Sequence, residues 1–223
     1  MTQKRVNPGQ SARFPWQTAI CRVGWLFACL AVFVATADAA ETKTIVFFGD
    51  SITAGYGLDP DEAYPALIQK KIDEAKLPGR VINAGLSGET TAGGLRRLDW
   101  VLKQPVDIFV LELGGNDGLR GIPLESSRSN LQTMIERVRG RYPHVTVVLA
   151  GMQLPTNLGP DYTRQFAAIF PDLAAAKHTL LIPFLLDKVG GVQNLNQADG
   201  IHPTAEGHQI LADTVWKILK PLL

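Results

Sequence analysis

Short apolar runs alternate with longer amphipathic segments along residues 40–223. Each short run is rich in β-branched or aromatic side chains and is nearly all apolar, which is typical of strands buried on both faces of a parallel sheet. Five such runs occur, at residues 44–49, 80–85, 107–114, 145–151 and 179–184. The alternation predicts an α/β fold in which helices cover both faces of the sheet.

Two of the longer segments have a clear helical period. Residues 126–141 carry apolar side chains at positions i, i+3, i+4 and i+7, and these are Leu131, Met134, Ile135 and Val138. A last helix is expected after Pro203, with one side formed by Leu211, Val215, Ile218 and Leu222. No internal repeat, low-complexity tract or linker interrupts residues 40–223, so this part of the chain predicts a single domain.

The first 39 residues follow a different pattern. An apolar run at residues 23–37 is preceded by four basic side chains, Lys4, Arg5, Arg13 and Arg22, and ends in the small-residue sequence Ala37-Asp38-Ala39. This order is typical of a secretory signal peptide that is cleaved after Ala39. We therefore expect export from a bacterial cell to the periplasm or the medium, and a mature chain of residues 40–223.

Three alternatives remain open for the N-terminal segment. It could be retained as an anchor, although the run of 15 residues is shorter than the roughly 18 that a spanning helix needs. It could form a buried core helix. It could also carry a lipid on Cys29, although Phe27 and Ala28 fit a lipidation site poorly.

Cysteine content and charge exclude two features of the mature chain. Both cysteines, Cys21 and Cys29, precede residue 40, so no disulfide can staple the predicted domain even in an oxidising compartment. The whole chain has a net charge of +1, and removal of four basic residues and Asp38 leaves 18 Lys and Arg against 20 Asp and Glu. A chain so balanced gives no reason to expect a nucleic-acid partner.

Polar residues follow each of the first three predicted strands. Ser51 comes directly after the first strand, Gly88 follows the second, and Asn116 follows the third. In open parallel sheets, ligands bind beyond the carboxyl ends of the strands. These three residues are therefore expected at the same edge of the sheet.

Ser51 alone has two interpretations. A serine between a strand and a helix is a favoured helix cap, whereas a nucleophilic serine requires a histidine base that a carboxylate orients. Both partners occur in the stretch ADGIHPTAEGH at residues 198–208, where Asp199 and His202 precede Pro203. Because proline disfavours helical geometry at the residue before it, His202 is expected at the end of a loop, on the same edge of the sheet as Ser51.

Donors for an oxyanion are offered by two glycine-containing stretches. SGET, around Gly88, and GGND, around Asn116, combine small residues with a short amide, which suits the close approach of a charged tetrahedral intermediate. Gly114 and Gly115 could instead suggest phosphate binding, but the chain has neither a Walker lysine nor a G-x-G-x-x-G stretch at this point. We interpret Asp50 as a brace for its loop, because it is too close to Ser51 in sequence to reach the far nitrogen of His202.

The chain resembles the SGNH, or GDSL-type, hydrolases over essentially all of residues 40–223. It is most similar to the bacterial subfamily of multifunctional acyl-CoA thioesterases, lysophospholipases and arylesterases. The matching stretches are GDSITAGY (49–56), ELGGNDGLRG (112–121), LPTNLG (154–159) and DGIHP (199–203). Four motifs in order are a specific signal, whereas a lone GDS would be a weak one.

The resemblance implies a three-layer α/β/α, flavodoxin-like fold with a five-stranded parallel sheet. It implies a serine esterase acting on acyl esters or thioesters, with Ser51 as nucleophile, Asp199 and His202 completing a triad, and no cofactor. The oxyanion hole would be formed by the Ser51 and Gly88 N–H groups and the Asn116 side chain.

The resemblance also implies where an acyl substrate would bind. A mobile loop at residues 117–122 would cover the acyl site, and Leu154 and Pro155 would line it. Within this loop Asp117, Leu119 and Ile122 are candidate substrate-binding residues, with Asp117 alternatively bracing the loop. The apolar residues suit an acyl chain better than a sugar, although apolar residues near a site are as often packing residues.

Other functions and partners stay open at this stage. A carbohydrate acetylesterase of the same fold is the main alternative, and a metal-dependent hydrolase using Asp50, Asp117, Asp199 and His202 is a weaker one. A secreted binding module without catalysis is a third. We expect a small-molecule substrate and transient contact with membrane lipid, and the sequence does not indicate an oligomeric state.

The remaining histidines are less suited to catalysis than His202. His208 is the rival base, but it is expected about two turns into the last helix, where helix packing determines its direction. His144 precedes a predicted strand and His178 ends a predicted helix. We interpret both as structural or solvated.

Overall fold

The computed structural model describes residues 41–223, which contain one parallel sheet of five strands in the order β2-β1-β3-β4-β5. The strands are β1 (Lys43–Gly49), β2 (Gly79–Gly85), β3 (Ile108–Glu112), β4 (Thr146–Ala150) and β5 (Leu180–Ile182). All five coincide with the predicted runs to within two residues at each end. The predicted signal peptide lies outside the described residues and stays a prediction.

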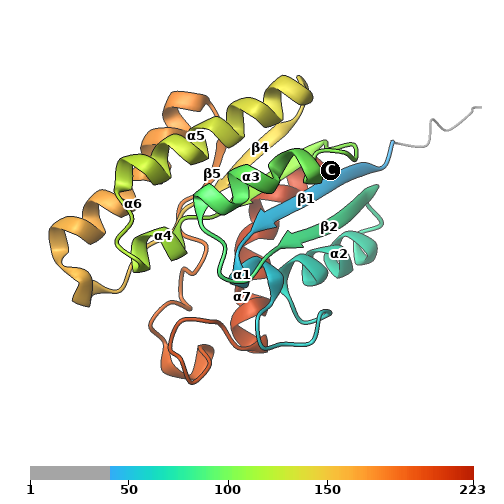
Figure 1. Ribbon diagram of the computed structural model, residues 1–223. Helices are drawn as coiled ribbons and strands as arrows, with labels where there is room; N and C mark the ends of the chain where they lie inside the picture. The colour runs from blue at the N-terminus through green and yellow to red at the C-terminus, as the bar shows by residue number, and fades with distance from the viewer. Residues whose placement is uncertain (1–40) are drawn as a thin grey trace, which may run out of the picture. The chain divides into compact units, whose positions relative to one another are not determined.

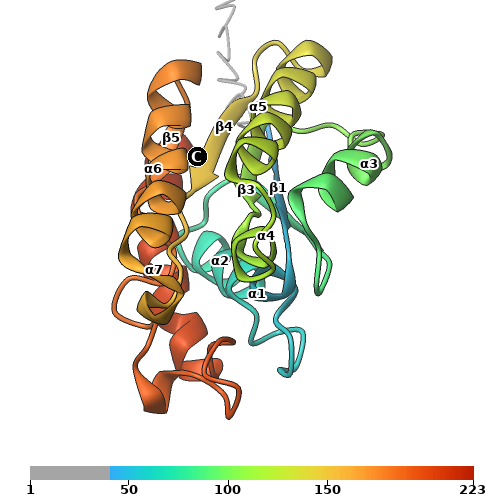
Figure 2. The ribbon, with the colours of Figure 1, turned by 60° about the vertical axis from the view of Figure 1, so that its left-hand side comes forward.

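Helices cover both faces of the sheet and make the predicted three-layer α/β/α fold (Figure 1). On one face, α3 (Thr91–Val101), α5 (Leu124–Arg141) and α6 (Pro160–Lys177) lie side by side, as Figure 2 shows. On the other face, α2 (Tyr64–Glu74) packs against α7 (Ala205–Leu219). The predicted helix at residues 126–141 is thus α5, which begins two residues earlier.

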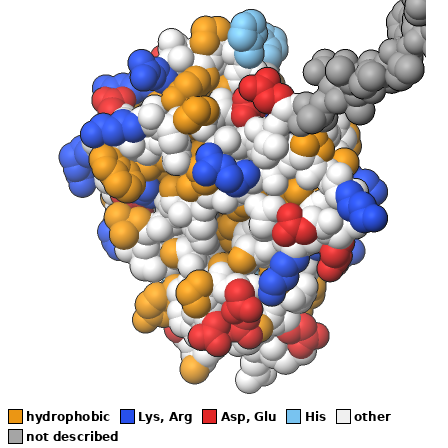
Figure 3. Space-filling model, turned by 90° about the vertical axis from the view of Figure 1, so that its right-hand side faces the viewer, with side chains coloured by type: hydrophobic (Ala, Val, Ile, Leu, Met, Phe, Trp, Pro, Cys, Tyr) orange, Lys and Arg blue, Asp and Glu red, His pale blue; other side chains and the backbone are white. Residues whose placement is uncertain are grey.

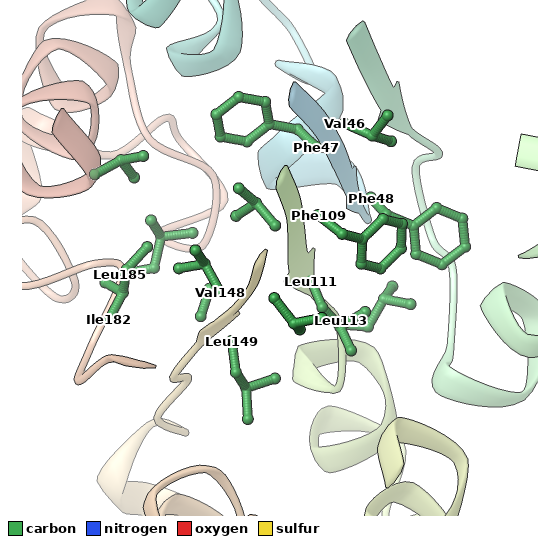
Figure 4. Close-up of a cluster of buried hydrophobic side chains, with 14 of the residues drawn as sticks. Val46, Phe47, Phe48, Phe109, Leu111, Leu113, Val148, Leu149, Ile182 and Leu185 are labelled. Atoms are coloured by element: carbon green, nitrogen blue, oxygen red, sulfur yellow. The ribbon is translucent and has the colours of Figure 1, made fainter. Parts of the chain in front are cut away.

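The core is centred on β1 and β3, which together with β4 are the strands that have a neighbour on each side. The side chains of Val46, Phe47 and Phe48 on β1 pack with Phe109 and Leu111 on β3 and are almost entirely buried (Figure 4). The prediction of strands buried on both faces is wrong for β2 and β5. Both are edge strands and stay partly exposed, because each pairs with only one neighbour.

The strand order creates a crevice at one edge of the sheet. From β1 the chain adds β2 on one side and then β3, β4 and β5 on the other, so the connections diverge between β1 and β3. Ligands of open parallel sheets bind where the connections diverge in this way. Two short helices mark the position, α1 (Ser51–Ala54) after β1 and α4 (Gly115–Leu119) after β3.

The surface of the described residues is mixed in charge. Figure 3 shows basic and acidic side chains interspersed, with apolar side chains between them, over the face that is on the right in Figure 1. Among residues 41–223, no helix combines the length and the apolar content that crossing a membrane requires.

Candidate active site

Ser51 is the first residue of α1 and lies at the carboxyl end of β1. Asp50 caps this short helix, with its Oδ1 accepting a hydrogen bond from the N–H of Ile52 at 3.0 Å. Gly55 ends the helix in the left-handed conformation at φ 76°, which glycine adopts without steric cost. The strand, the cap and the glycine together hold Ser51 at the edge of the sheet.

Ser51, His202 and Asp199 form a continuous chain of hydrogen bonds. His202 Nε2 lies 2.8 Å from Ser51 Oγ, and His202 Nδ1 lies 2.6 Å from Asp199 Oδ2. Asp199 Oδ1 accepts hydrogen bonds from the N–H groups of Ile201 and His202, at 2.9 and 3.0 Å. The structure therefore brings together the three residues that the sequence predicts as a triad.

The protonation of this chain follows from the environment of Asp199. Desolvation raises the pKa of its carboxyl, but the hydrogen bonds from the side chain and backbone of His202 and from Ile201 together outweigh it and lower the pKa to about 2. Asp199 is therefore ionised at neutral pH, and it requires His202 Nδ1 to carry the proton. Nε2 is then free to accept the Ser51 hydroxyl proton.

Asn116 lies on α4 beside Ser51, and its amide is oriented by hydrogen bonds at both ends. Its Nδ2 donates to Asp50 Oδ2 at 3.1 Å, and its Oδ1 accepts from Arg120 at 3.3 Å. The same Arg120 nitrogen donates to the carbonyl of Gly88 at 3.1 Å. Arg120 thus links the two predicted oxyanion segments, and Asn116 presents its amide to the cavity that Ser51 lines.

Ser51 opens into a cavity of about 520 Å³, a volume within the usual range of small-molecule sites. The predicted residues Leu119, Leu154 and Pro155 line it, together with apolar side chains that the sequence does not single out, namely Met152, Phe184, Leu186 and Ile201. Asp50 and His202 are the ionisable side chains of this lining. The cavity walls are therefore suited to an apolar group.

Four predicted site residues are not part of the cavity lining within residues 41–223: Gly88, Asp117, Ile122 and Asp199, the last of which contacts His202 instead. Asp117 is buried and accepts hydrogen bonds from the N–H and Oγ1 of Thr91, at 2.8 and 2.5 Å, and from Ser127 Oγ at 3.1 Å. Its position corrects the substrate-binding expectation in favour of the alternative: the carboxylate braces α4 against α3 and α5. With Asp117 directed to Thr91, the four residues of the metal-site alternative do not gather at one point.

A buried acid, Glu112, lies beneath Ser51 and was missed in the sequence. Its Oε2 accepts hydrogen bonds from the N–H of Asp50 at 3.1 Å and from Thr53 Oγ1 at 2.7 Å, while Oε1 has no partner in the described part of the chain. Burial, and then the charge of Asp50, raise the pKa of Glu112 well above its usual range. The signal that could have revealed it is one acid within an otherwise apolar strand.

Asp50 experiences the same buried environment. Burial raises its pKa to about 6, against the opposing effect of the hydrogen bonds from Ile52 and Asn116. Because two buried carboxyls this close do not both ionise readily, we assign the proton at neutral pH to Glu112 and the charge to Asp50. Asp50 thus braces its loop, as expected, and also orients Asn116.

The other histidines lie away from the Ser51 hydroxyl. His208 is buried in the first turn of α7, not two turns in, and its Nδ1 accepts a hydrogen bond from the N–H of Tyr64 at 3.0 Å. Burial, with a smaller effect of His202, lowers the pKa of His208 to about 4. His178 ends α6 in the left-handed conformation and His144 precedes β4, both exposed.

The fold and the site define a class of protein. Residues 47–210 match the model of the GDSL-like lipase/acylhydrolase family, and the chain belongs to this family. The chain is therefore a carboxylic ester hydrolase.

Individual relatives agree with that assignment. The chain is 44% identical to the esterase TesA of Pseudomonas aeruginosa, over 89% of this chain and 98% of that protein. It is 36% identical to thioesterase 1/protease 1/lysophospholipase L1 of Escherichia coli K12, over 89% of this chain and 94% of that protein. A crystal structure of the psychrotrophic esterase EstA from Pseudoalteromonas sp., inhibited by monoethylphosphonate, superimposes with a TM-score of 0.76 and 32% identity, over 81% of this chain and 98% of that one.

Proposed function

We propose that the chain is an exported serine esterase that hydrolyses carboxylic esters and thioesters of acyl chains through an acyl-enzyme on Ser51. The observation that carries this proposal is the unbroken chain from Asp199 through His202 to Ser51, with 2.8 Å between Nε2 and Oγ. A base within this distance of a hydroxyl can take its proton in the transition state.

The reaction follows from the geometry in two halves. Ser51 Oγ attacks the carbonyl carbon while its proton passes to His202 Nε2, and the oxyanion is stabilised by the Asn116 amide and by the Ser51 and Gly88 N–H groups. Collapse of this intermediate breaks the bond to the alcohol or thiol, which receives the proton from Nε2. A water molecule then attacks the acyl-enzyme with His202 as base, which releases the acid and restores Ser51.

The cavity supports an acyl chain as the group that is bound. Its apolar walls come from Leu119, Leu154 and Phe184, among others, and they can bury a hydrocarbon chain at a gain of about 25 cal/mol per Å². Two similar proteins are named for ester or thioester hydrolysis, a thioesterase/lysophospholipase and an arylesterase, the latter from Vibrio mimicus with 36% identity. Transient contact with membrane lipid is part of the proposal, as a source of such substrates.

Export is proposed on the sequence pattern of residues 1–39. Mass spectrometry of the protein recovered outside the cytoplasm should find a chain that begins at Ala40. An intact N-terminus on all of the exported protein would contradict cleavage.

Substitution of the triad tests the function directly. Ser51→Ala and His202→Ala should each lower kcat on p-nitrophenyl esters by about 10⁴-fold or more, since each removes a part of one proton-transfer unit. Ser126→Ala, an exposed serine on α5, is the matched control and should keep full activity. A p-nitrophenyl phosphonate should transfer its phosphonyl group to Ser51 of the wild-type chain with release of p-nitrophenolate, and the mass of that group should not appear on the Ser51→Ala variant.

The contrary outcome is retention of ester hydrolysis by Ser51→Ala with the fold intact, which would reject Ser51 as nucleophile. Rates on short, medium and long acyl p-nitrophenyl esters, an acyl-CoA, a lysophospholipid and an acetylated sugar then rank the substrates. A preference for the acetylated sugar would favour the carbohydrate acetylesterase alternative.

A further inference from the structure

The segment that follows Ser51 is joined to the loop of His202 by one side chain, Gln197. Gln197 Nε2 donates hydrogen bonds to the carbonyl of Tyr56 at 2.7 Å and to the carbonyl of Pro203 at 3.0 Å. The N–H of Gln197 donates to the carbonyl of His202 at 2.7 Å. One residue thus holds the backbone on both sides of the His202–Pro203 bond and connects it to the end of the α1 turn.

Tyr56 is fixed at the other end of this connection. Its N–H donates to the carbonyl of Ser51 at 3.0 Å, and the flanking Gly55 and Gly57 both adopt the left-handed conformation, at φ 76° and 79°. A Cβ at Gly57 would lie 2.4 Å from Gln197 Oε1. A side chain at position 57 would therefore push the Gln197 amide away from its position beside the turn.

This turn places the Tyr56 ring against the catalytic imidazole. The two ring centroids lie 4.6 Å apart with a tilt of 42°, while the Tyr56 residue stays 51% exposed. The ring covers a side of His202 that neither Ser51 nor Asp199 occupies.

The imidazole becomes a cation when it takes the Ser51 proton. A cation within about 6 Å of an aromatic centroid is stabilised by the ring. The other titratable groups around His202 are Asp199 on its own loop, Asp50 at the end of β1 and His208 on α7. Tyr56, in contrast, contacts the imidazole through the surface of its aromatic ring.

We propose that Tyr56 and Gln197 are positioning residues that act as one clamp: Gln197 joins the Ser51 segment to the His202 loop, and the Tyr56 ring keeps the imidazole in place and stabilises its protonated form. This inference rests on the proposed function of the Ser51–His202–Asp199 chain. It assigns a role to two residues that the family motifs alone do not explain.

Tyr56→Leu tests the ring. It should lower kcat on a p-nitrophenyl ester by about three- to five-fold, which is the size of an exposed cation–aromatic contact. KM should change less than twofold, and the acid limb of the kcat–pH profile should move to lower pH by about half a unit. Tyr56→Phe keeps the ring and should restore both the rate and the position of the limb. Trp100→Leu, at a 70% exposed aromatic on α3, is the matched control.

Gln197→Ala tests the hydrogen-bonded connection between the segment that follows Ser51 and the loop of His202. It should lower kcat by about tenfold, since small misplacements of a catalytic group are costly, and it should leave the acid limb in place because no charge is removed. Gln132→Ala on α5 is the control for loss of a glutamine. In the double variant with Tyr56→Leu, the losses should be smaller than the product of the two single effects, because the residues act as one unit.

Active-site titration with a phosphonate gives kcat per folded molecule, so loss of folded protein does not imitate either result. Wild-type kcat and an unmoved acid limb in Tyr56→Leu would overturn the proposal, and so would equal losses in Tyr56→Leu and Tyr56→Phe. A change confined to KM would also overturn it, because it would make Tyr56 a substrate contact. These outcomes leave Ser51→Ala inactive, which distinguishes them from failure of the proposed function.

Discussion

Glu112 illustrates how far single residues in this protein depend on their surroundings. An acid at the end of a buried strand is costly if it is charged, and no cation pairs with it among the described residues. Its Oε2 nevertheless accepts hydrogen bonds from both Asp50 and Thr53, the residues on either side of the Ser51–Ile52 pair. The protonated acid therefore acts as a neutral hydrogen-bond acceptor under the site.

Replacement of this acid by its amide should be tolerated. Glu112→Gln should change the free energy of unfolding at pH 7 by less than about 1 kcal/mol, whereas Glu112→Ala should lose about 1 to 3 kcal/mol because it leaves buried donors unsatisfied. Because the pKa of Glu112 is raised in the folded chain, protonation of Glu112 stabilises the fold. This contribution is fully present below the usual pKa of a glutamate, and it is lost as the pH rises through the folded pKa. Glu112→Gln should lack that decline in urea unfolding curves. Equal damage from Gln and Ala at pH 7 would show that Glu112 is charged.

His208 should make the protein sensitive to acid. Its pKa is about 4 in the folded chain and 6.5 as a reference, so between these values unfolding takes up a proton. The contribution of His208 to stability is complete above pH 6.5 and is lost as the pH falls through 4, up to about 3 kcal/mol in total. Asp50, whose folded pKa is raised to about 6, acts in the opposite direction over this range.

His208→Gln isolates this effect, because it keeps an acceptor for the Tyr64 N–H and does not titrate. Urea unfolding at pH 7, 5.5 and 4.5 should show a smaller loss of stability in the variant than in the wild type, with Asp50 contributing equally to both. Identical pH dependence in the two proteins would contradict a buried neutral His208. Ester hydrolysis at pH 7 should be retained.

At the residue scale, the sequence identifies the residues that carry chemistry and misses the residues that hold them. Ser51, Asp199 and His202 can be found because each lies in a motif with a chemical reason for its spacing. The roles of Tyr56, Gln197 and Glu112 were not predicted, although Tyr56 and Glu112 lie within the quoted motifs, because those roles depend on which loop returns beside which strand. Asp117 was expected in a loop as a candidate substrate-binding residue, with its bracing role only as the alternative, for the same reason.

At the scale of elements, α1 depends on how closely it can approach β2. A Cβ at Gly85, the last residue of β2, would lie 2.3 Å from the backbone nitrogen of Ala54 and 2.7 Å from its Cα. Backbone atoms cannot rotate away as a flexible side chain can. The absence of a side chain at Gly85 therefore sets the position of the helix that carries Ser51.

Gly85→Ala should displace α1, with a loss of about 1 to 3 kcal/mol of stability and at least a tenfold loss in kcat, because Ser51 moves relative to His202. Gly140→Ala is the matched control, since it lies in α5 with nothing within 4 Å of the added Cβ. It should be neutral or stabilising by up to about 1 kcal/mol. Thermal unfolding and ester hydrolysis measure both, and a silent Gly85→Ala would show that α1 can move without consequence.

The elements that the sequence predicts best are those with a long, regular pattern. The five apolar runs and the periodic helix α5 were found because burial imposes their spacing. The helix α4 was not, since five residues that include two glycines carry no helical period. The exposure of β2 was missed because a run of apolar residues does not reveal how many neighbours a strand has.

At the scale of the whole molecule, the site results from strand order rather than from any one motif. The arrangement β2-β1-β3-β4-β5 puts β1 and β3 next to each other, and with them Ser51 and Asn116. The cavity then extends over β4 and β5, whose following segments supply Met152, Leu154 and Phe184. Hydrophobic periodicity does not determine strand order, so the prediction of a flavodoxin-like arrangement rests on the resemblance to a family.

Ser51 and His202, the two halves of the proposed catalytic unit, are 151 residues apart in the chain. A growing polypeptide carries its serine from an early stage of synthesis, but it has no base for that serine until the stretch that contains His202 has emerged and folded back onto the first strand. Under the proposed mechanism, ester hydrolysis therefore requires that His202 has been synthesised and that its loop has folded back beside Ser51. Under the proposed export route, this delay would spare the lipids of the producing cell from an enzyme that is still unfinished.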